Sequence, residues 1–468
     1  MTLLDRLSAA IGAQHVLTGT DTARYATDWT AVYSAVPLAV VRPANTAEVA
    51  DVVRIVSEAG VAIVPVGGNT GLCGGTYASD AIMVSLERMN AIREIRPEAR
   101  VAVVEAGVVL DTLHAEAAAH GLTFPLTFGA RGSAMIGGCL STNAGGSNVL
   151  RYGSTRGLCF GLEVVLPSGE VLDLMTALHK DNSGYDLKDL FIGAEGTLGI
   201  ITAATLKLVP KPSAYATAMV ALSSLDDALA LLNRLQEATG GAVEAFEYMP
   251  GATVEAWCDH FKEMRPPFDR TYDVNILVEV GATAPRDATP APDGSLPVVD
   301  DLETLLGEML EEGTVLDAVV ARSEAQRAEM WNRREHHADV ALGKPPFVNA
   351  DVSVPLDRVQ TFLDGMASKL PALDPEAYPL IVCHLGDGNI HYSALISSDD
   401  LYDPVLAAVE DQALSLGGSF SAEHGIGKSK LASMRRRKDP VALKVMRQVK
   451  AALDPEGLMN PGKVLPEA

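Results

Sequence analysis

Short apolar runs alternate with amphipathic segments over the first two hundred residues of the chain. Residues 38–43 (LAVVRP), 61–68 (VAIVPVGG), 81–86 (AIMVSL) and 101–107 (VAVVEAG) are rich in β-branched residues, and each ends near Gly, Pro or Asp. Runs of this length and composition predict β-strands that end in turns. Because segments with helical spacing lie between them, we expect a mixed fold in this region rather than an all-β one.

Residues 45–60 (NTAEVADVVRIVSEAG) carry the clearest helical pattern of this region. Apolar positions three and four residues apart form a partly apolar stripe. The stripe consists of Ala47, Val49, Val52, Val53 and Val56. Thr46 followed by Glu48 predicts an acidic helix start, and Gly60 predicts the stop.

The pattern changes near Pro210 and Pro212. Strand-like runs then alternate with helices such as residues 224–240, and a Pro/Ala-rich stretch at 281–297 predicts an exposed loop. The segment from Glu423 onward is mostly helical in pattern. We therefore expect an α+β protein with a first domain at 1–212, a second at 213–422 and a C-terminal helical segment at 423–468.

Length, charge and cysteine content narrow the class of protein. A chain of 468 residues exceeds what one core usually fills, and its net charge of −23 argues against nucleic acid or an anionic membrane as partner. The five cysteines lie far apart, which fits a reducing compartment. The N-terminus lacks a signal-peptide pattern and no apolar run reaches membrane-spanning length, so a cytoplasmic protein is expected.

Glycine is concentrated in loops that follow the predicted strands. Residues 65–75 (PVGGNTGLCGG) match neither the dinucleotide fingerprint nor the phosphate loop of nucleotide kinases. Successive backbone N–H groups at Gly67, Gly68 and Gly71 can still form an anion-binding nest, and Asn69 and Thr70 add hydrogen-bond donors. A glycine-rich turn without a ligand is the weaker alternative for this loop taken alone.

A second glycine cluster, at residues 129–154, changes that balance. It combines glycines with Ser133, Ser141, Thr142 and Asn143 and carries almost no net charge. Two such loops can enclose a diphosphate and a flat heterocycle through backbone groups. Together, the two clusters predict a cofactor cradle.

These loops, with residues 180–202 (KDNSGYDLKDLFIGAEGTLGIIT), resemble the FAD-binding domain of the vanillyl-alcohol oxidase flavoprotein family. Within that family the chain is most similar to the D-2-hydroxyacid dehydrogenases, and to the branch that oxidises D-2-hydroxyglutarate. The resemblance implies an FAD-binding domain of two subdomains and a substrate (cap) domain with an antiparallel sheet. Because no histidine lies between Gly60 and Leu110, we expect the FAD to be bound non-covalently.

The resemblance also implies which residues contact FAD. The first loop would hold the pyrophosphate, and the other two segments would line the adenosine and isoalloxazine parts. The implied residues are Pro65, Gly67, Gly68, Asn69, Thr70, Gly71, Leu72, Ser133, Ile136, Gly138, Thr142, Asn143, Gly145, Glu195, Gly196, Ile200, Ile201 and Asn460.

The segment at 381–395 (IVCHLGDGNIHYSAL) places His384 and His391 on either side of a Gly-Asp-Gly-Asn run. If Asp387 and Gly388 form a two-residue turn, His384 lies directly opposite His391. Two imidazoles so placed can reach one divalent ion. A cross-strand histidine pair without metal explains the spacing equally well.

The family resemblance supplies the rest of a metal site. It assigns His384, His391 and Glu423 as metal ligands and His424 as the catalytic base. Two histidines and a carboxylate suit Zn²⁺, with Mn²⁺, Co²⁺ or Fe²⁺ compatible on ligand type. On this hypothesis the substrate chelates the metal, and His424 accepts a proton while hydride passes to the flavin.

The segment at 330–355 contains an arginine that matches the family's substrate-carboxylate residue, Arg334. An arginine offers a bidentate fork to a carboxylate, although a solvated basic patch is the plainer explanation. This chain differs from the hydroxyglutarate branch at three positions that are implied to lie near the substrate. They are Ala338, Asn349 and Ser393. Lys344 is the candidate to supply the positive charge that the branch has at one of these positions and this chain lacks.

The sequence therefore predicts an FAD- and metal-dependent D-2-hydroxyacid dehydrogenase. D-2-hydroxyglutarate is the first candidate substrate, with D-lactate and D-malate as alternatives. An electron-transfer flavoprotein or a quinone-linked carrier is the expected acceptor, and the family suggests a homodimer. Competing hypotheses are a glycolate-oxidase-like flavin subunit, an oxygen-using oxidase, a metal-dependent hydrolase and a protein that binds FAD without turnover.

Overall fold

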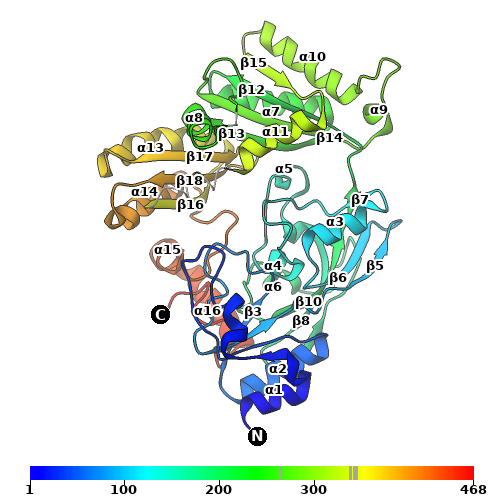
Figure 1. The fold of residues 1–468 in the computed structure, drawn as a ribbon, viewed down its shortest axis with the longest axis vertical. Helices are drawn as coiled ribbons and strands as arrows, with labels where there is room; N and C mark the ends of the chain where they lie inside the picture. Colours follow the sequence, from blue (N-terminus) through cyan, green and yellow to red (C-terminus); the bar gives the residue numbers. More distant parts are fainter. Residues whose placement is uncertain (263–264, 337–339, 341–345, 468) are drawn as a thin grey trace. The chain divides into compact units, whose positions relative to one another are not determined.

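The computed structural model describes residues 1–262, 265–336, 340 and 346–467 (Figure 1). Contacts divide the chain into two compact units. The first unit comprises residues 1–146, 153–210 and 423–468, and the second comprises residues 147–152 and 211–422. Each unit has its own sheets and its own apolar core.

The first unit begins with a four-stranded sheet in the order β1-β2-β4-β3. Its strands are β1 (Val16–Leu17), β2 (Ala39–Val41), β3 (Ala62–Val66) and β4 (Ala81–Ser85). The three predicted strands β2, β4 and β3 run parallel, and β1 is antiparallel to β2. Helices α1 (Leu3–Ile11) and α2 (Thr46–Glu58) supply apolar side chains to the core beside this sheet.

Helix α2 confirms the predicted helix and corrects its details. The N-cap is Asn45, one residue before the predicted start, and its side chain accepts a hydrogen bond from the Glu48 amide at 2.9 Å. Asparagine is among the strongest N-cap residues because its side-chain oxygen satisfies a free amide of the first turn. Of the predicted stripe, Ala47 is exposed, and Ala50 lies in the core in its place.

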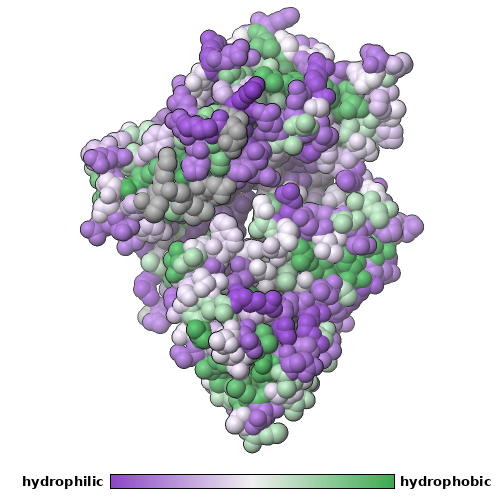
Figure 2. Space-filling view, in the orientation of Figure 1, coloured by the Kyte–Doolittle hydropathy of each residue, from purple (hydrophilic) through white to green (hydrophobic). Residues whose placement is uncertain are grey.

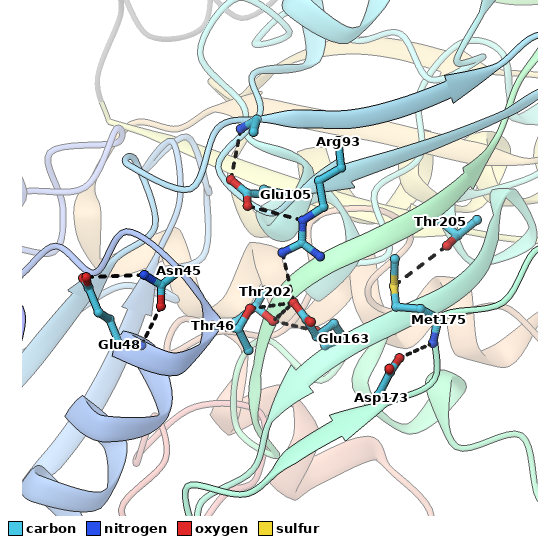
Figure 3. A network of polar contacts seen from close by, with 11 residues as sticks. Asn45, Thr46, Glu48, Arg93, Glu105, Glu163, Asp173, Met175, Thr202 and Thr205 are labelled. Atoms are coloured by element: carbon cyan, nitrogen blue, oxygen red, sulfur yellow. Dashed lines mark hydrogen bonds and ion pairs between the residues drawn. The ribbon is translucent and has the colours of Figure 1, made fainter.

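A five-stranded antiparallel sheet follows, in the order β5-β6-β10-β8-β9. Its strands are β5 (Ile92–Arg96), β6 (Val101–Glu105), β8 (Cys159–Val165), β9 (Val171–Asp173) and β10 (Ile200–Lys207). Glu163 on β8 accepts hydrogen bonds from Thr46 at the start of α2, from Thr202 on β10 and from Arg93 on β5 (Figure 3). This network fastens α2 to the second sheet, so the first unit contains two joined subdomains.

The remaining elements of the first unit are short, apart from its last helix. They are α3 (Leu110–Ala118), β7 (Leu122–Thr123), α4 (Ile136–Ser141), α6 (Lys188–Phe191), β11 (Val209–Pro210), α15 (Leu431–Arg437) and α16 (Pro440–Leu453). Short helices α4 and α6 lie in or next to the glycine-rich segments singled out from the sequence.

The second unit is built on a seven-stranded antiparallel sheet in the order β15-β12-β14-β13-β17-β18-β16. Its strands are β12 (Ala214–Leu222), β13 (Val243–Pro250), β14 (Val274–Ala282), β15 (Val315–Val320), β16 (Phe347–Ser353), β17 (Tyr378–His384) and β18 (Asn389–Leu395). This sheet confirms the α+β prediction for the second part of the chain.

The two faces of this sheet carry different sets of helices. One face shares a core with α7 (Leu225–Thr239), α10 (Pro297–Glu311), α13 (Val359–Leu373) and α14 (Tyr402–Ser415). The opposite face shares a smaller core with α8 (Gly251–His260) and α11 (Glu324–Glu335). The unit also contains α5 (Val149–Tyr152) and α9 (Pro285–Ala288). Among the described residues, fewer helices share a core with this second face, which also carries polar side chains.

Hydrophilic side chains cover much of the face of the protein seen in Figure 2, interrupted by smaller apolar patches. In the described part of the chain, no helix combines the length and the apolar character needed to cross a bilayer.

Candidate metal and flavin sites

Polar side chains collect on the α8/α11 face of the second unit's sheet. Glu247 on β13 is paired with His384 on β17, which is paired with Asn389 on β18. Further along β18, His391 is paired with Asp351 on β16. Because directly paired residues share a face and side chains alternate along a strand, these five residues project to the same side. The sheet therefore presents two imidazoles between two carboxylates.

The hairpin that carries the histidines differs from its predicted register. His384 is paired with Asn389 rather than with His391, and His391 is paired with Val382. Four residues form the turn instead of two, and the amides of Asp387 and Gly388 both donate to the His384 carbonyl. The shift moves His391 by two positions along its strand, which preserves its face. The imidazoles are thus diagonal neighbours with ring centroids 5.1 Å apart.

His384 is held by a buried carboxylate that the sequence analysis missed. Its Nδ1 lies 2.8 Å from Oε1 of Glu247, and Arg334 Nε donates to Oε2 of the same carboxylate at 2.7 Å. Burial alone would raise the pKa of Glu247, but the charges of His384 and Arg334 hold it below its usual range. The contact favours the tautomer that carries a proton on Nδ1, so Nε2 is the ring atom that can serve as a metal ligand.

His391 also faces a buried carboxylate, at ion-pair distance rather than hydrogen-bond distance. Its Nδ1 lies 3.7 Å from Oδ1 of Asp351, which is 1% exposed, and the Asn389 side chain donates to the same oxygen at 2.9 Å. Ligand nitrogens of the two histidines lie within 4.8 Å of one another. Metal-binding histidines usually donate their second ring N–H to a carboxylate, which fixes the tautomer and the ring orientation. The donor set of this face therefore fits a divalent metal ion.

The predicted third ligand and base, Glu423 and His424, begin the last segment of the first unit. The amide of Ala422, the residue before them, donates to the carbonyl and to the carboxylate of Asp351. Within the first unit, a β-carbon added to Gly145 would lie 2.9 Å from Oε1 of Glu423. Within the first unit, Glu423 therefore lies against a predicted flavin loop.

The predicted substrate residues are partly brought together. Arg334 lies near the end of α11, and its Nη2 lies 3.4 Å from His384 Nε2. Asn349 and Ser393 are directly paired on β16 and β18, and the serine hydroxyl lies 3.3 Å from the Asn349 side-chain oxygen. Both side chains project from the same face of the sheet as His391, because side chains alternate along a strand. Ala338 and Lys344 lie outside the described residues.

The three predicted flavin segments meet within the first unit. A β-carbon on Gly68 would lie 2.0 Å from the Ser133 carbonyl oxygen, and one on Gly196 would lie 2.4 Å from Cγ of Pro65. The amide of Glu195 donates to the Ser141 carbonyl at 2.8 Å. Glycine at these positions lets the segments approach at a distance that no other residue permits.

Four of the eight described non-glycine residues with positive φ in this unit are predicted flavin residues. Asn69, Asn143, Glu195 and Asn460 all have positive φ, between 43° and 54°. Non-glycine residues adopt this conformation rarely, and such outliers concentrate at binding sites because the surrounding structure must enforce them. This clustering supports a ligand-binding role for the same loops.

Hydrogen bonds show how the surrounding structure enforces these conformations. The Asn460 side chain donates to the carbonyls of Gly75 and Glu195 at 3.0 and 2.7 Å. The Glu195 carboxylate accepts the amides of Ile426 and Gly427 at 2.7 and 2.8 Å, and burial raises its pKa despite these bonds. The glycine-lined loops and their fixed backbone amides fit the diphosphate of a dinucleotide.

Replacing Gly68 with alanine should weaken FAD binding about tenfold or more. The new methyl group would collide with the Ser133 carbonyl, so the two loops must separate, at a cost of about 1–3 kcal/mol. Titration of the apoprotein with FAD, followed by flavin fluorescence, measures the change. Gly307 in α10 is the control, because a β-carbon there meets no atom within 4 Å and the residue lies in none of the predicted flavin segments. Equal FAD affinity in the Gly68→Ala variant and the unchanged protein would contradict the close approach.

Comparisons with known proteins agree with a flavin-binding protein. Residues 37–175 match the family described as FAD binding domain, and residues 211–464 match the family described as FAD linked oxidases, C-terminal domain. The chain is 37% identical to D-2-hydroxyglutarate dehydrogenase, mitochondrial, of Bos taurus, over 94% of this chain and 79% of the relative. It is 36% identical to D-2-hydroxyglutarate dehydrogenase of Xanthomonas citri pv. viticola, over 95% and 92%.

Solved structures with the same fold are more distant in sequence. p-Cresol methylhydroxylase aligns with a TM-score of 0.73 at 16% identity and covers 98% of this chain and 96% of its own. Alkyldihydroxyacetonephosphate synthase also aligns with a TM-score of 0.73, at 18% identity, over 98% and 84%. Identity this low supports the fold alone, and the predicted fold class is confirmed.

Proposed function

The chain belongs to the family of FAD-linked oxidases, and on that premise we propose that it is an FAD- and divalent-metal-dependent dehydrogenase of a D-2-hydroxy acid. The observation that carries this proposal is the pair of imidazoles, each backed by a buried carboxylate, with Arg334 beside them. D-2-hydroxyglutarate is the first substrate to test, because relatives bearing that enzyme's name cover nearly the whole chain.

Each group has a distinct role in the proposed reaction. FAD, when bound, accepts two electrons, and a divalent ion held by His384, His391 and Glu423 supplies a Lewis acid for the substrate oxygens. Zn²⁺ suits this ligand set, and Mn²⁺, Co²⁺ and Fe²⁺ are the alternatives. Arg334 binds the substrate carboxylate through its Nη groups while its Nε stays on Glu247.

Oxidation of the hydroxy acid to the 2-oxo acid removes two electrons and two protons. His424 accepts one of the protons, since a histidine can titrate near neutral pH. His424 directly follows Glu423 and lies two residues after Ala422, whose amide donates to Asp351. This position in the chain supports the role. Asn349 and Ser393 extend the same face along the strands and are proposed to contact the distal end of the substrate.

The electrons then leave for an external acceptor, for which we propose an electron-transfer flavoprotein or a quinone-linked carrier. The flavoprotein families matched by the chain favour this oxidoreductase over a metal-dependent hydrolase. The bovine relative is named as mitochondrial, so the cytoplasmic location of this protein stays a prediction. The homodimer is likewise a prediction.

Anaerobic mixing of metal-replete, FAD-loaded protein with a panel of D-2-hydroxy acids tests the proposal. The flavin absorbance should bleach with at least one D-acid, and a chelator should suppress the bleaching. The L-enantiomers serve as controls for specificity. Flavin that stays oxidised with every D-acid in the panel would show that the proposed function is wrong.

A further inference from the structure

The segment at 428–450 differs in charge from the rest of this acidic protein. It contains nine basic residues and one acidic residue, a formal charge of +8, whereas the whole chain carries −23. The segment comprises a short loop, α15 and most of α16, all within the first unit (Figure 1). Its basic residues are Lys428, Lys430, Arg435, Arg436, Arg437, Lys438, Lys444, Arg447 and Lys450.

Part of this segment is exposed and combines positive charge with apolar side chains. Arg435 and Arg436 are exposed near the end of α15. On α16, Val441 and Val445 are 67% and 51% exposed, and exposed Lys444 lies on the same side of the helix by its spacing. Within the described part of the chain, neither Arg435 nor Lys444 forms an ion pair. We call these five residues the basic surface.

The segment is fastened at both ends to the loops that are proposed to hold FAD. The amides of Lys428 and Ser429 donate to the Cys73 carbonyl in the first glycine loop at 2.8 and 3.1 Å. At the other end, Lys450 Nζ donates to the Thr197 carbonyl at 2.6 Å and to the Met459 carbonyl at 2.7 Å. The helices bearing the basic surface therefore rest on the flavin-binding part of the first unit.

We propose that the basic surface is the docking site of an acidic electron-carrier protein. The inference rests on the proposed function, since electrons from the hydroxy acid must leave reduced FAD for an acceptor outside the chain. The carrier takes up the two electrons, and the two protons go to solvent. An acidic partner is repelled by most of a surface with net charge −23, so a local positive surface selects one docking orientation.

The composition of α16 favours a protein over a membrane as the partner. Helices that lie on membranes expose a broad apolar face, often with Trp, Phe or Leu. Here Leu443 is buried in the protein, and the exposed large apolar side chains of α16 are two valines. Two valines beside basic side chains are typical of a small protein-docking surface, where charge sets orientation and apolar contact adds affinity.

Charge reversal of Arg435 and Lys444 tests the proposal. The double variant Arg435→Glu/Lys444→Glu should lower kcat/KM for an acidic electron-transfer flavoprotein about tenfold or more. With a small uncharged quinone as acceptor, its turnover should stay within about twofold of the unchanged enzyme, because neither residue contacts the proposed catalytic groups. The control variant Lys262→Glu/Arg286→Glu reverses the same number of charges at side chains that are 76% and 86% exposed in the second unit.

Direct binding of the flavoprotein to oxidised enzyme, measured by calorimetry, separates this inference from the proposed function. If no hydroxy acid reduces the flavin, the proposed function is wrong. The docking site is still supported if Arg435→Glu/Lys444→Glu binds the flavoprotein more weakly and the control variant does not. Equal kcat/KM and equal flavoprotein affinity in both double variants would overturn it. The inference would also be wrong if the unchanged enzyme binds anionic phospholipid vesicles, the Arg435→Glu/Lys444→Glu variant does not, and the two bind the flavoprotein equally. That result would indicate a membrane as the partner.

Discussion

Replacing His424 with alanine should slow flavin reduction by a D-2-hydroxy acid about 10²–10⁴-fold, while FAD and metal stay bound. The variant loses the group proposed to accept a substrate proton but keeps all three proposed metal ligands. Stopped-flow absorbance under anaerobic conditions measures the rate of bleaching. Flavin content and metal content of the purified variant show whether the site is otherwise intact.

His120→Ala is the matched control, because this histidine is exposed at the surface of the same unit. Its flavin should be reduced at the rate of the unchanged enzyme. Imidazole added to the His424→Ala variant should restore part of the lost rate if a missing base is the cause. A His424→Ala variant whose flavin bleaches within a few-fold of the normal rate would refute the assignment.

Local sequence patterns were sufficient to predict most of the elements. The apolar runs became β2, β3, β4 and β6, and the 45–60 pattern became α2. These elements follow from the spacing of residues close together in the chain. Helix α2 begins at Thr46 as predicted, and its N-cap Asn45, whose side chain accepts from the Glu48 amide, was not singled out from the sequence.

The metal hairpin shows what a turn sequence can and cannot predict. Asp387-Gly388 favours a two-residue turn, but Gly386 packs against Leu150 and Gly388 packs against Val354, so contacts from distant segments select a longer turn. The shared face of the two histidines survived this error because the register moved by two positions. A shift by one position would have separated them.

The carboxylates behind the histidines could not be predicted from local sequence. Glu247 lies 137 residues before His384, and nothing in its strand pattern indicates an ionised side chain that is 1% exposed. The order of strands in the sheet, with β13 beside β17, brings the two together. That order depends on long-range pairing, which a single sequence does not reveal.

Replacing Glu247 with glutamine should weaken metal binding about 10–100-fold. The carboxylate accepts from His384 on Oε1 and from Arg334 on Oε2. Glutamine retains one oxygen, so its amide NH₂ must face one of these two donors. Either His384 loses the bond that orients its ring, or Arg334 is left unpaired in a buried site, at a cost of about 1–3 kcal/mol. Competition with a chelating dye measures the affinity without turnover.

Glu244→Gln is the matched control for that variant. Glu244 is also buried, but both Arg151 and the Tyr152 hydroxyl donate to its Oε1 alone, so the glutamine oxygen can keep both bonds. Its metal affinity should equal that of the unchanged protein, even if the lost charge lowers the Tm. A normal metal affinity in a well-folded Glu247→Gln variant would mean that His384 is oriented without Glu247. A parallel loss in both variants would mean that the effect comes from the sheet rather than from the bond to His384.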